Sequence, residues 1–246
     1  MGDAACYVYA VVGREVSVGD AGVAGAPVTT VASDGLAAVV SPVGEGRVRA
    51  SRAALSAHER VVEAAASTTT TVPLQFGVVL PSRAAVVDDL LQARRFQLAH
   101  LLGVLDGKAE YRLEATFDEQ RAIRVALDGD PRLRRLVERR KASPAYGDRI
   151  AVGEAVAGAV GRVTGAWAEA VLDHLRPHAD ASAVLPTRRP EMALRAAFLV
   201  EQAARAGFDA AVDEVAAQLA GHLALHLVGP LAPWDFVGGA VAGDGR

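Results

Sequence analysis

A strict alternation of side chains opens the second half of the chain. Apolar or small residues take every second position and polar residues the positions between them: Tyr111, Leu113, Ala115 and Phe117 alternate with Arg112, Glu114 and Thr116. Because successive side chains of a β-strand point to opposite faces of its sheet, the pattern predicts a strand with one buried and one solvated face. It is the clearest half-buried strand in the sequence, and it predicts a sheet in the second half.

The patterns after this strand follow a definite order. Hydrophobic periodicity and turn residues predict two long helices with a turn at Ser143 and Pro144, then two strands, a helix and a last strand. The predicted elements span 118–141, 149–176, 183–185, 192–200, 208–221 and 223–228. The order is that of a ferredoxin-like module in which a long helical hairpin is inserted in place of the first helix.

The first half predicts a smaller α+β unit. Asp34 and Gly35 give a hairpin signal between two short strands, and Ser82 is a plausible helix N-cap. The expected strands span 6–12, 28–32 and 36–41, and the expected helices span 51–66 and the stretch after Ser82. The helical hydrophobic pattern ends at Asp106 and Gly107, and a strand pattern begins after them. We therefore predict a domain over 1–106, a second domain over 107–236 and a flexible tail over 237–246.

The segment after the last predicted strand contains two prolines and two large aromatic residues. Gly229 and Pro230 should end that strand, because proline lacks the backbone N–H that a further step of the ladder needs. Pro233 then restricts the backbone beside Trp234 and Phe236. Such a segment is anchored, either folded back on its own domain or presented to a partner. The large area of two aromatic rings favours folding back onto the second domain.

Motifs in four stretches occur in a fixed order along the chain. They are an opening strand from Tyr7 to Val12, a Pro-Leu-x-Phe-Gly motif with Pro73, Phe76 and Gly77, a hydrophobic strand Ala196–Val200, and a Gly-Pro-x-x-Pro-aromatic-x-Phe ending with Gly229, Pro230, Pro233, Trp234 and Phe236. Together they resemble the gas vesicle protein GvpF/GvpL family. Leu231 and Ala232 depart from the aromatic residue and proline usual there, and Trp234 replaces a tyrosine.

The resemblance implies a fold and a function. The fold would be α+β, with two ferredoxin-like domains and helices that project from the second. The function would be that of a non-catalytic accessory protein that binds the hydrophobic gas vesicle shell protein, acts with other gas vesicle accessory proteins in the cytoplasm, and helps to nucleate or assemble the vesicle wall. The motif residues would then be structural or bind a partner.

Charge and hydropathy argue against several classes of partner. The chain has 26 basic and 29 acidic residues and a formal net charge of −3, which does not favour nucleic acid or an anionic membrane. No apolar run approaches the ~20 residues that span a bilayer. Asp3 and the interruption by Arg14 and Glu15 argue against a signal peptide. The single cysteine, Cys6, agrees with a reducing cytoplasm.

Few patterns point to catalysis, a cofactor or a metal. Gly103–Lys108 approaches a phosphate loop, but its spacing is short and Ala109 stands where Ser or Thr would hold magnesium. A helix end with glycine is the better interpretation. Two histidine pairs have a spacing that suits a metal only on one uninterrupted helix, which is predicted for neither: His174 with His178 and His222 with His226. We expect no catalytic, cofactor-binding or metal-binding residue.

Positive charge gathers at the end of the helix predicted over 118–141. The basic residues are Arg132, Arg134, Arg135, Arg139, Arg140 and Lys141. A solvated helix C-terminus, favoured by the helix dipole, is the simpler interpretation. The alternative is a patch that binds an acidic surface of a protein partner. On either interpretation, the arginines should add little to stability.

A second class of function stays open on the sequence alone. Ferredoxin-like domains host many functions, and an enzyme or sensor of this fold would bind a small molecule between its sheet and helices. A pocket with convergent polar groups would favour this alternative, whereas a shallow surface would favour a role in assembly.

Overall fold

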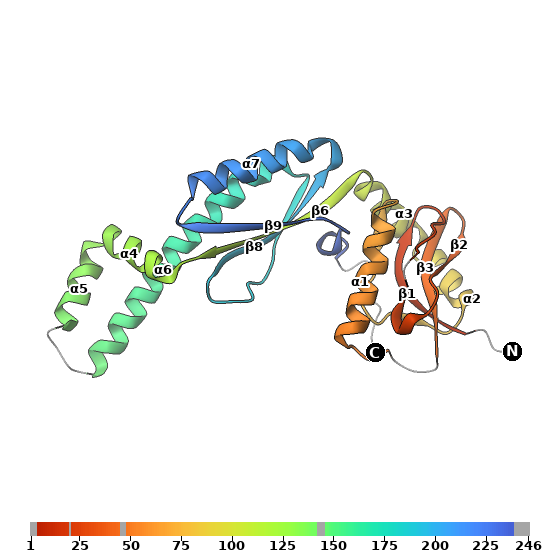
Figure 1. The fold of residues 1–246 in the computed structure, drawn as a ribbon, viewed down its shortest axis with the longest axis horizontal. Coiled ribbons are helices and arrows are strands. Elements are labelled where there is room, and N and C mark those ends of the chain that lie inside the picture. Colours follow the sequence, from red (N-terminus) through yellow and green to blue (C-terminus); the bar gives the residue numbers. More distant parts are fainter. Residues whose placement is uncertain (1–3, 20, 45–47, 142–145, 239–246) are drawn as a thin grey trace. The chain divides into compact units, whose positions relative to one another are not determined.

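The computed structural model describes residues 4–19, 21–44, 48–141 and 146–238. Its fold is α+β, as predicted, with two antiparallel sheets and their helices (Figure 1). Contacts divide the chain into two units. The first unit is Met1–Glu110 together with Gly229–Arg246, and the second is Tyr111–Val228.

The sheet of the first unit has a ferredoxin-like strand order. Its strands are β1 (Ala5–Val12), β2 (Thr29–Ser33), β3 (Leu36–Val43), β4 (Thr71–Pro73) and β5 (Val79–Leu80). The order is β2-β3-β1-β4, and β5 also pairs with β1. Between β1 and β2, where a ferredoxin-like module has its first helix, the described residues form a loop with a short 3-10 turn at Val23–Gly25.

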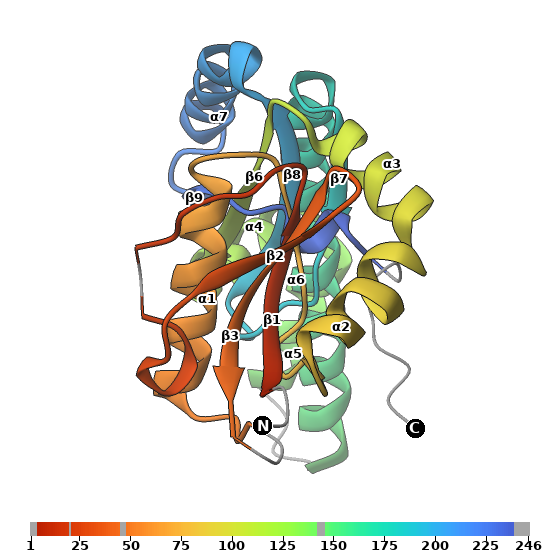
Figure 2. The same ribbon diagram turned by 90° about the vertical axis from the view of Figure 1, so that its right-hand side faces the viewer.

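Strand β1 is buried on both faces. From Cys6 to Val12, no side chain is more than 3% exposed. Helix α1 (Arg52–Ala66) lies on one side of the strands, and α2 (Arg83–Ala85) lies on the other (Figures 1 and 2). A strand covered on both faces needs a continuous apolar run, which explains why the alternation of apolar and polar residues predicted at Tyr111–Phe117 is missing here.

The predicted hairpin is confirmed. Asp34 and Gly35 form a two-residue turn between β2 and β3, and Ser33 pairs with Leu36 across it. The φ angles of the two turn residues are 46° and 79°. Both are positive, as in the type I′ turns whose twist matches that of the two flanking strands.

The single helix predicted after Ser82 is three consecutive helical segments. The Ser82 hydroxyl accepts the backbone N–H of Ala85 at 3.0 Å, so the predicted N-cap is confirmed. A π-helical stretch, Val86–Gln92, follows α2, and α3 runs over Arg95–Leu105. Gly107, with φ 69°, follows the end of α3. The segment that approaches a phosphate loop is therefore a helix end.

The second unit contains the other sheet. Its strands are β6 (Lys108–Phe117), β7 (Ala181–Val184), β8 (Met192–Glu201) and β9 (Leu223–Leu231), in the order β7-β8-β6-β9. Helix α7 (Arg205–Gln218) connects β8 to β9. The predicted alternation in β6 is confirmed, because Tyr111, Leu113 and Ala115 are buried. The last strand was predicted to end at Gly229, but it continues to Leu231.

The helix predicted over 118–141 is two helices, so that prediction was wrong. Helix α4 spans Glu119–Gly129 and α5 spans Pro131–Lys141. Pro131 has no backbone N–H to continue a helix, and it disfavours the helical conformation at Asp130, whose φ and ψ are −127° and 94°. Both helices pack on α6 (Tyr146–Leu175), around a small core of Ala126, Leu133 and Ala159. The turn predicted at Ser143 and Pro144 lies outside the described residues.

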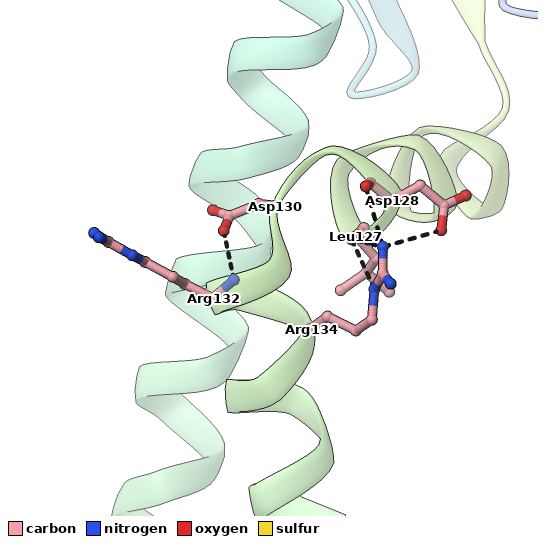
Figure 3. A network of polar contacts seen from close by, with 5 residues as sticks. All are labelled: Leu127, Asp128, Asp130, Arg132 and Arg134. Atoms are coloured by element: carbon pink, nitrogen blue, oxygen red, sulfur yellow. Dashed lines mark hydrogen bonds and ion pairs between the residues drawn. The ribbon is translucent and has the colours of Figure 1, made fainter.

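Asp130 forms the start of α5. Its Oδ1 accepts the backbone N–H groups of Arg132 at 2.9 Å and Leu133 at 3.1 Å (Figure 3 shows the first bond). The bond from Leu133, then that from Arg132, holds the pKa of the Asp130 carboxyl below its ordinary value. The Asp-Pro step therefore both stops α4 and caps α5.

Candidate functional site

Motif residues from distant parts of the sequence meet around His58 of α1. The His58 side chain is 2% exposed. Four aromatic rings surround it: the distances between ring centroids are 5.6 Å to Tyr7, 5.6 Å to Tyr9, 5.7 Å to Phe76 and 5.7 Å to Trp234. We call these five residues the His58 cluster. It joins β1, α1, the segment after β4 and the C-terminal segment in the core of the first unit.

A chain of hydrogen bonds fixes the tautomer of His58. Its Nε2 lies 3.0 Å from the carbonyl oxygen of Leu74, which can only accept, so Nε2 carries the proton. Nδ1 of the neutral ring then accepts a hydrogen bond from the Tyr7 hydroxyl, at 3.0 Å. The Tyr7 oxygen in turn accepts the backbone N–H of Gly77, at 3.0 Å. The chain thus ties the motif around Gly77 to β1 and α1.

Burial keeps this chain uncharged. It raises the pKa of Tyr7 to about 12, against the opposing effect of the Gly77 N–H bond. It also lowers the pKa of His58, although the hydrogen bond to Leu74 acts in the other direction. Neutral Tyr7 and neutral His58 are the forms that the observed hydrogen bonds require. The arrangement is therefore structural: it satisfies buried polar groups and positions the segments that contain them.

A carboxylate of α1 holds the C-terminal segment. Glu63 Oε2 accepts the backbone N–H of Ala232 at 2.8 Å, and Oε1 accepts the indole N–H of Trp234 at 2.9 Å. Ala232 is fully buried in the same core as the His58 cluster. Beyond it, the backbone N–H of Asp235 donates to Glu110 Oε2 at 2.8 Å. Trp234 therefore packs on the first unit, and the prediction that it folds onto the second domain was wrong.

The other motif residues have different surroundings. Gly77 has φ 96°, a conformation that favours glycine, and Pro73 ends β4. Pro233 is buried and Phe236 is half-buried in the terminal segment. Gly229 and Pro230 lie exposed in β9.

The basic residues of α5 do not form one uniform patch. Arg132, Arg135 and Arg139 are exposed, and the side chain of Arg140 lies outside the described residues. Arg134 is different: its guanidinium donates to the carbonyl oxygen of Leu127 at 3.2 Å and to that of Asp128 at 3.1 Å (Figure 3). It also lies 3.7 Å from the Asp128 carboxylate. Arg134 therefore caps the carbonyl groups at the end of α4.

Replacement of these arginines should separate the two roles. Arg134→Gln should destabilise the protein by about 0.5–1.5 kcal/mol, because it removes the cap of α4. The paired change of Arg135 and Arg139 to Gln should cost roughly 0–1 kcal/mol, because both side chains are exposed. Thermal unfolding of both variants measures the difference. An Arg134→Gln variant as stable as the wild type would contradict the capping role.

The candidate metal residues have surroundings of other kinds, although the ring centroids of His174 and His178 lie 6.2 Å apart. Among the described residues, no group of three or more His, Cys, Asp or Glu is placed to hold a metal ion. The ring of His222 packs on Trp167 at 4.9 Å, and His174 Nε2 lies 3.5 Å from Glu214. In the described part of the chain, no helix is long and apolar enough to cross a membrane.

Sequence reasoning missed the two residues that organise the site. His58 lies in the helix predicted over 51–66, but nothing in the sequence indicated that it lies at the centre of the motifs. Glu63 carried no signal at all. Glu63 follows His58 by five residues, and this spacing did not indicate that both residues contact the C-terminal segment.

Comparisons with known proteins agree with this convergence of motifs. The family model of the gas vesicle synthesis protein GvpL/GvpF matches residues 5–238. Gas vesicle protein F of Streptomyces sp. (strain CB03234) is 35% identical over 216 residues, which cover 86% of this chain and 88% of that protein. Gas vesicle protein F of Nostoc sp. (strain PCC 7120) is 25% identical over 206 residues, 82% of this chain and 84% of that protein.

Solved structures show the same fold. The crystal structure of GvpF from Anabaena sp. PCC7120 has a TM-score of 0.85 at 22% identity, covering 96% of this chain and 98% of that one. The structure of GvpF from Microcystis aeruginosa has a TM-score of 0.78 at 23% identity, covering 95% and 99%. With the family match over nearly the whole length, the chain belongs to the gas vesicle protein GvpL/GvpF family.

Proposed function

We propose that this protein binds the hydrophobic shell protein of the gas vesicle and assists nucleation or assembly of the vesicle wall, without a catalytic step. The observation that carries the proposal is the family match over residues 5–238, which includes both the Pro-Leu-x-Phe-Gly motif and the C-terminal motif. The action would take place in the cytoplasm, together with other gas vesicle accessory proteins.

The physical argument concerns apolar surface. A shell subunit that exposes an apolar face aggregates unless that face is covered before assembly. Exposed apolar side chains are available on both units: Phe96 of α3 is 89% exposed, Val184 of β7 is 61% exposed and Val228 of β9 is 43% exposed. Strands β7 and β9 lie at the two edges of their sheet. Strand pairing at such an edge, or contact with a helix face, would cover the subunit.

Co-purification tests the proposal. The tagged protein and the shell protein, expressed together, should elute as a complex, and the tagged protein alone should turn over no small molecule. A tagged Phe96→Ser variant should retain less shell protein if α3 contributes to the contact. Recovery of the tagged protein without shell protein, alongside a saturable activity on a small molecule, would contradict the proposal and favour the enzyme or sensor alternative.

A further inference from the structure

The first unit contains an open groove outside the His58 cluster. It lies between the loop Ala21–Ala26, the end of β3 with Gly44, Val48 and Arg49 after it, and the first turns of α1, and its volume is about 820 Å³. Of the sixteen described lining residues, thirteen are Ala, Gly, Val or Pro. These small side chains leave the groove apolar and give another chain access to its floor.

Hydrogen bonds to Tyr9 of β1 and within the loop hold the loop Ala21–Ala26, which forms one wall of the groove. The hydroxyl of Tyr9 accepts the backbone N–H of Val23 at 2.8 Å and lies 2.7 Å from the hydroxyl of Ser41. Gly22 passes so close to Tyr9 that a Cβ would collide with the hydroxyl, and its N–H donates to the carbonyl oxygen of Ala26 at 2.8 Å. The wall is therefore preformed, which lowers the ordering cost of binding.

The described lining residues carry charge of one sign. Among them, Arg49 and Arg60 are the charged residues, and both side chains are exposed. Neither forms an ion pair with a carboxylate of the described residues; Arg60 Nε donates to the carbonyl oxygen of Ser56 at 3.4 Å. From Ser51 at the N-cap to Arg60, the helix axis rises about 14 Å at ~1.5 Å per residue. A guanidinium group binds carboxylates with two parallel hydrogen bonds.

We propose that this groove binds an apolar segment of a partner protein that carries carboxylate side chains. The apolar walls would cover the small or aliphatic side chains of the segment, and the two arginines would pair with its acidic residues. The groove is open to solvent and is not an enclosed cavity. That suits a segment whose other face remains packed on its own protein better than it suits a small molecule enclosed on all sides. The inference concerns the chemistry of the segment and does not depend on the shell protein being its source.

Peptide binding to the full-length protein tests the inference. The probes are two fluorescein-labelled synthetic peptides of about 12 residues, which extend about 18 Å as a helix. They share one pattern of Leu and Ala and differ only in carrying Glu or Lys. In fluorescence anisotropy, the Glu peptide should bind saturably and the Lys peptide should not. Arg49→Gln and Arg60→Gln should each weaken binding about tenfold, as expected for the loss of one charged hydrogen-bonding partner.

Matched variants make the test specific. Arg52→Gln removes an exposed arginine of the same helix that does not line the groove, and it should leave binding unchanged. Ala53→Trp should block the groove, and since Ala53 is exposed the fold should tolerate the ring. The double variant Arg49→Glu with Arg60→Glu should reverse the preference and bind the Lys peptide.

The inference would be overturned if the Glu peptide showed no saturable binding. It would also be overturned if Arg52→Gln and Arg60→Gln changed the affinity for the Glu peptide by the same factor. A charge-reversed variant that still prefers the Glu peptide would contradict it as well. Circular dichroism melting confirms that each variant is folded. Failure of peptide binding with intact co-purification of the shell protein would reject the groove and leave the proposed function standing.

Discussion

Trp234→Ala should lower the melting temperature of this protein by about 5–10 °C. The change removes a ring that packs 5.7 Å from His58 and the indole N–H that donates to Glu63. A fully buried Trp replaced by Ala costs about 3–5 kcal/mol; Trp234 is half-buried, so we expect about 2–3 kcal/mol. That is a large share of a typical stability of ~5–15 kcal/mol. Thermal unfolding followed by circular dichroism measures it.

Trp234→Phe is the matched control. It keeps an aromatic ring beside His58 and removes only the donor to Glu63, so it should cost about 0.5–1.5 kcal/mol. Shell-protein binding, measured on the same Trp234→Ala preparation, separates packing from a direct contact. Unchanged melting with lost binding would show that Trp234 is an anchor for the partner, and would contradict its structural role.

Acid should weaken the first unit through His58. Burial lowers the pKa of His58 in the folded protein, whereas the unfolded chain titrates near the ordinary value of ~6.5. As the pH falls through that value, the unfolded chain takes up a proton that the folded form resists, so the free energy of unfolding decreases with falling pH. The slope approaches ~1.4 kcal/mol per pH unit until the folded pKa is reached. The contribution is fully present above the ordinary pKa.

Two histidine variants identify the source of this slope. His58→Gln should flatten the dependence of the unfolding free energy on pH, from neutral pH downward. His100→Gln, at an exposed histidine on α3 of the same unit, is the matched control for the loss of a histidine. Chemical denaturation at a series of pH values gives the slopes, and NMR of the His58 ring gives its titration directly. A His58 ring that titrates at its ordinary pKa would contradict this account.

Local rules accounted for much of the fold. Period-two alternation placed β6, and the pair Asp34 and Gly35 placed the β2–β3 turn, because both signals depend on neighbouring residues alone. The break at Pro131 was also local, since proline disfavours the helical conformation in the residue before it, but the apolar spacing on both sides concealed it. The extension of β9 past Gly229 was not local, because pairing with β6 overrides the weak strand tendency of glycine and proline.

The site could be predicted from the sequence less well than the fold. Its family-like motifs were visible one by one, but their meeting around His58 depends on the paths of β1, α1 and the C-terminal segment. The docking of Trp234 is decided by Glu63, whose two oxygens accept hydrogen bonds from residues 169 and 171 positions further along the chain. Neither hydrophobic periodicity nor residue spacing in the sequence indicates such a contact. Arg134 likewise shared the pattern of its exposed neighbours, yet it caps α4.

The most direct test of the proposed function is sedimentation of the shell protein after dilution from denaturant. With this protein present in equimolar amount, the shell protein should stay in the supernatant and elute with it in size-exclusion chromatography. An inert protein of similar size and charge should leave the shell protein in the pellet. If the shell protein pellets equally with both, and the two proteins elute separately, the central claim that this chain binds and shields the shell protein is wrong.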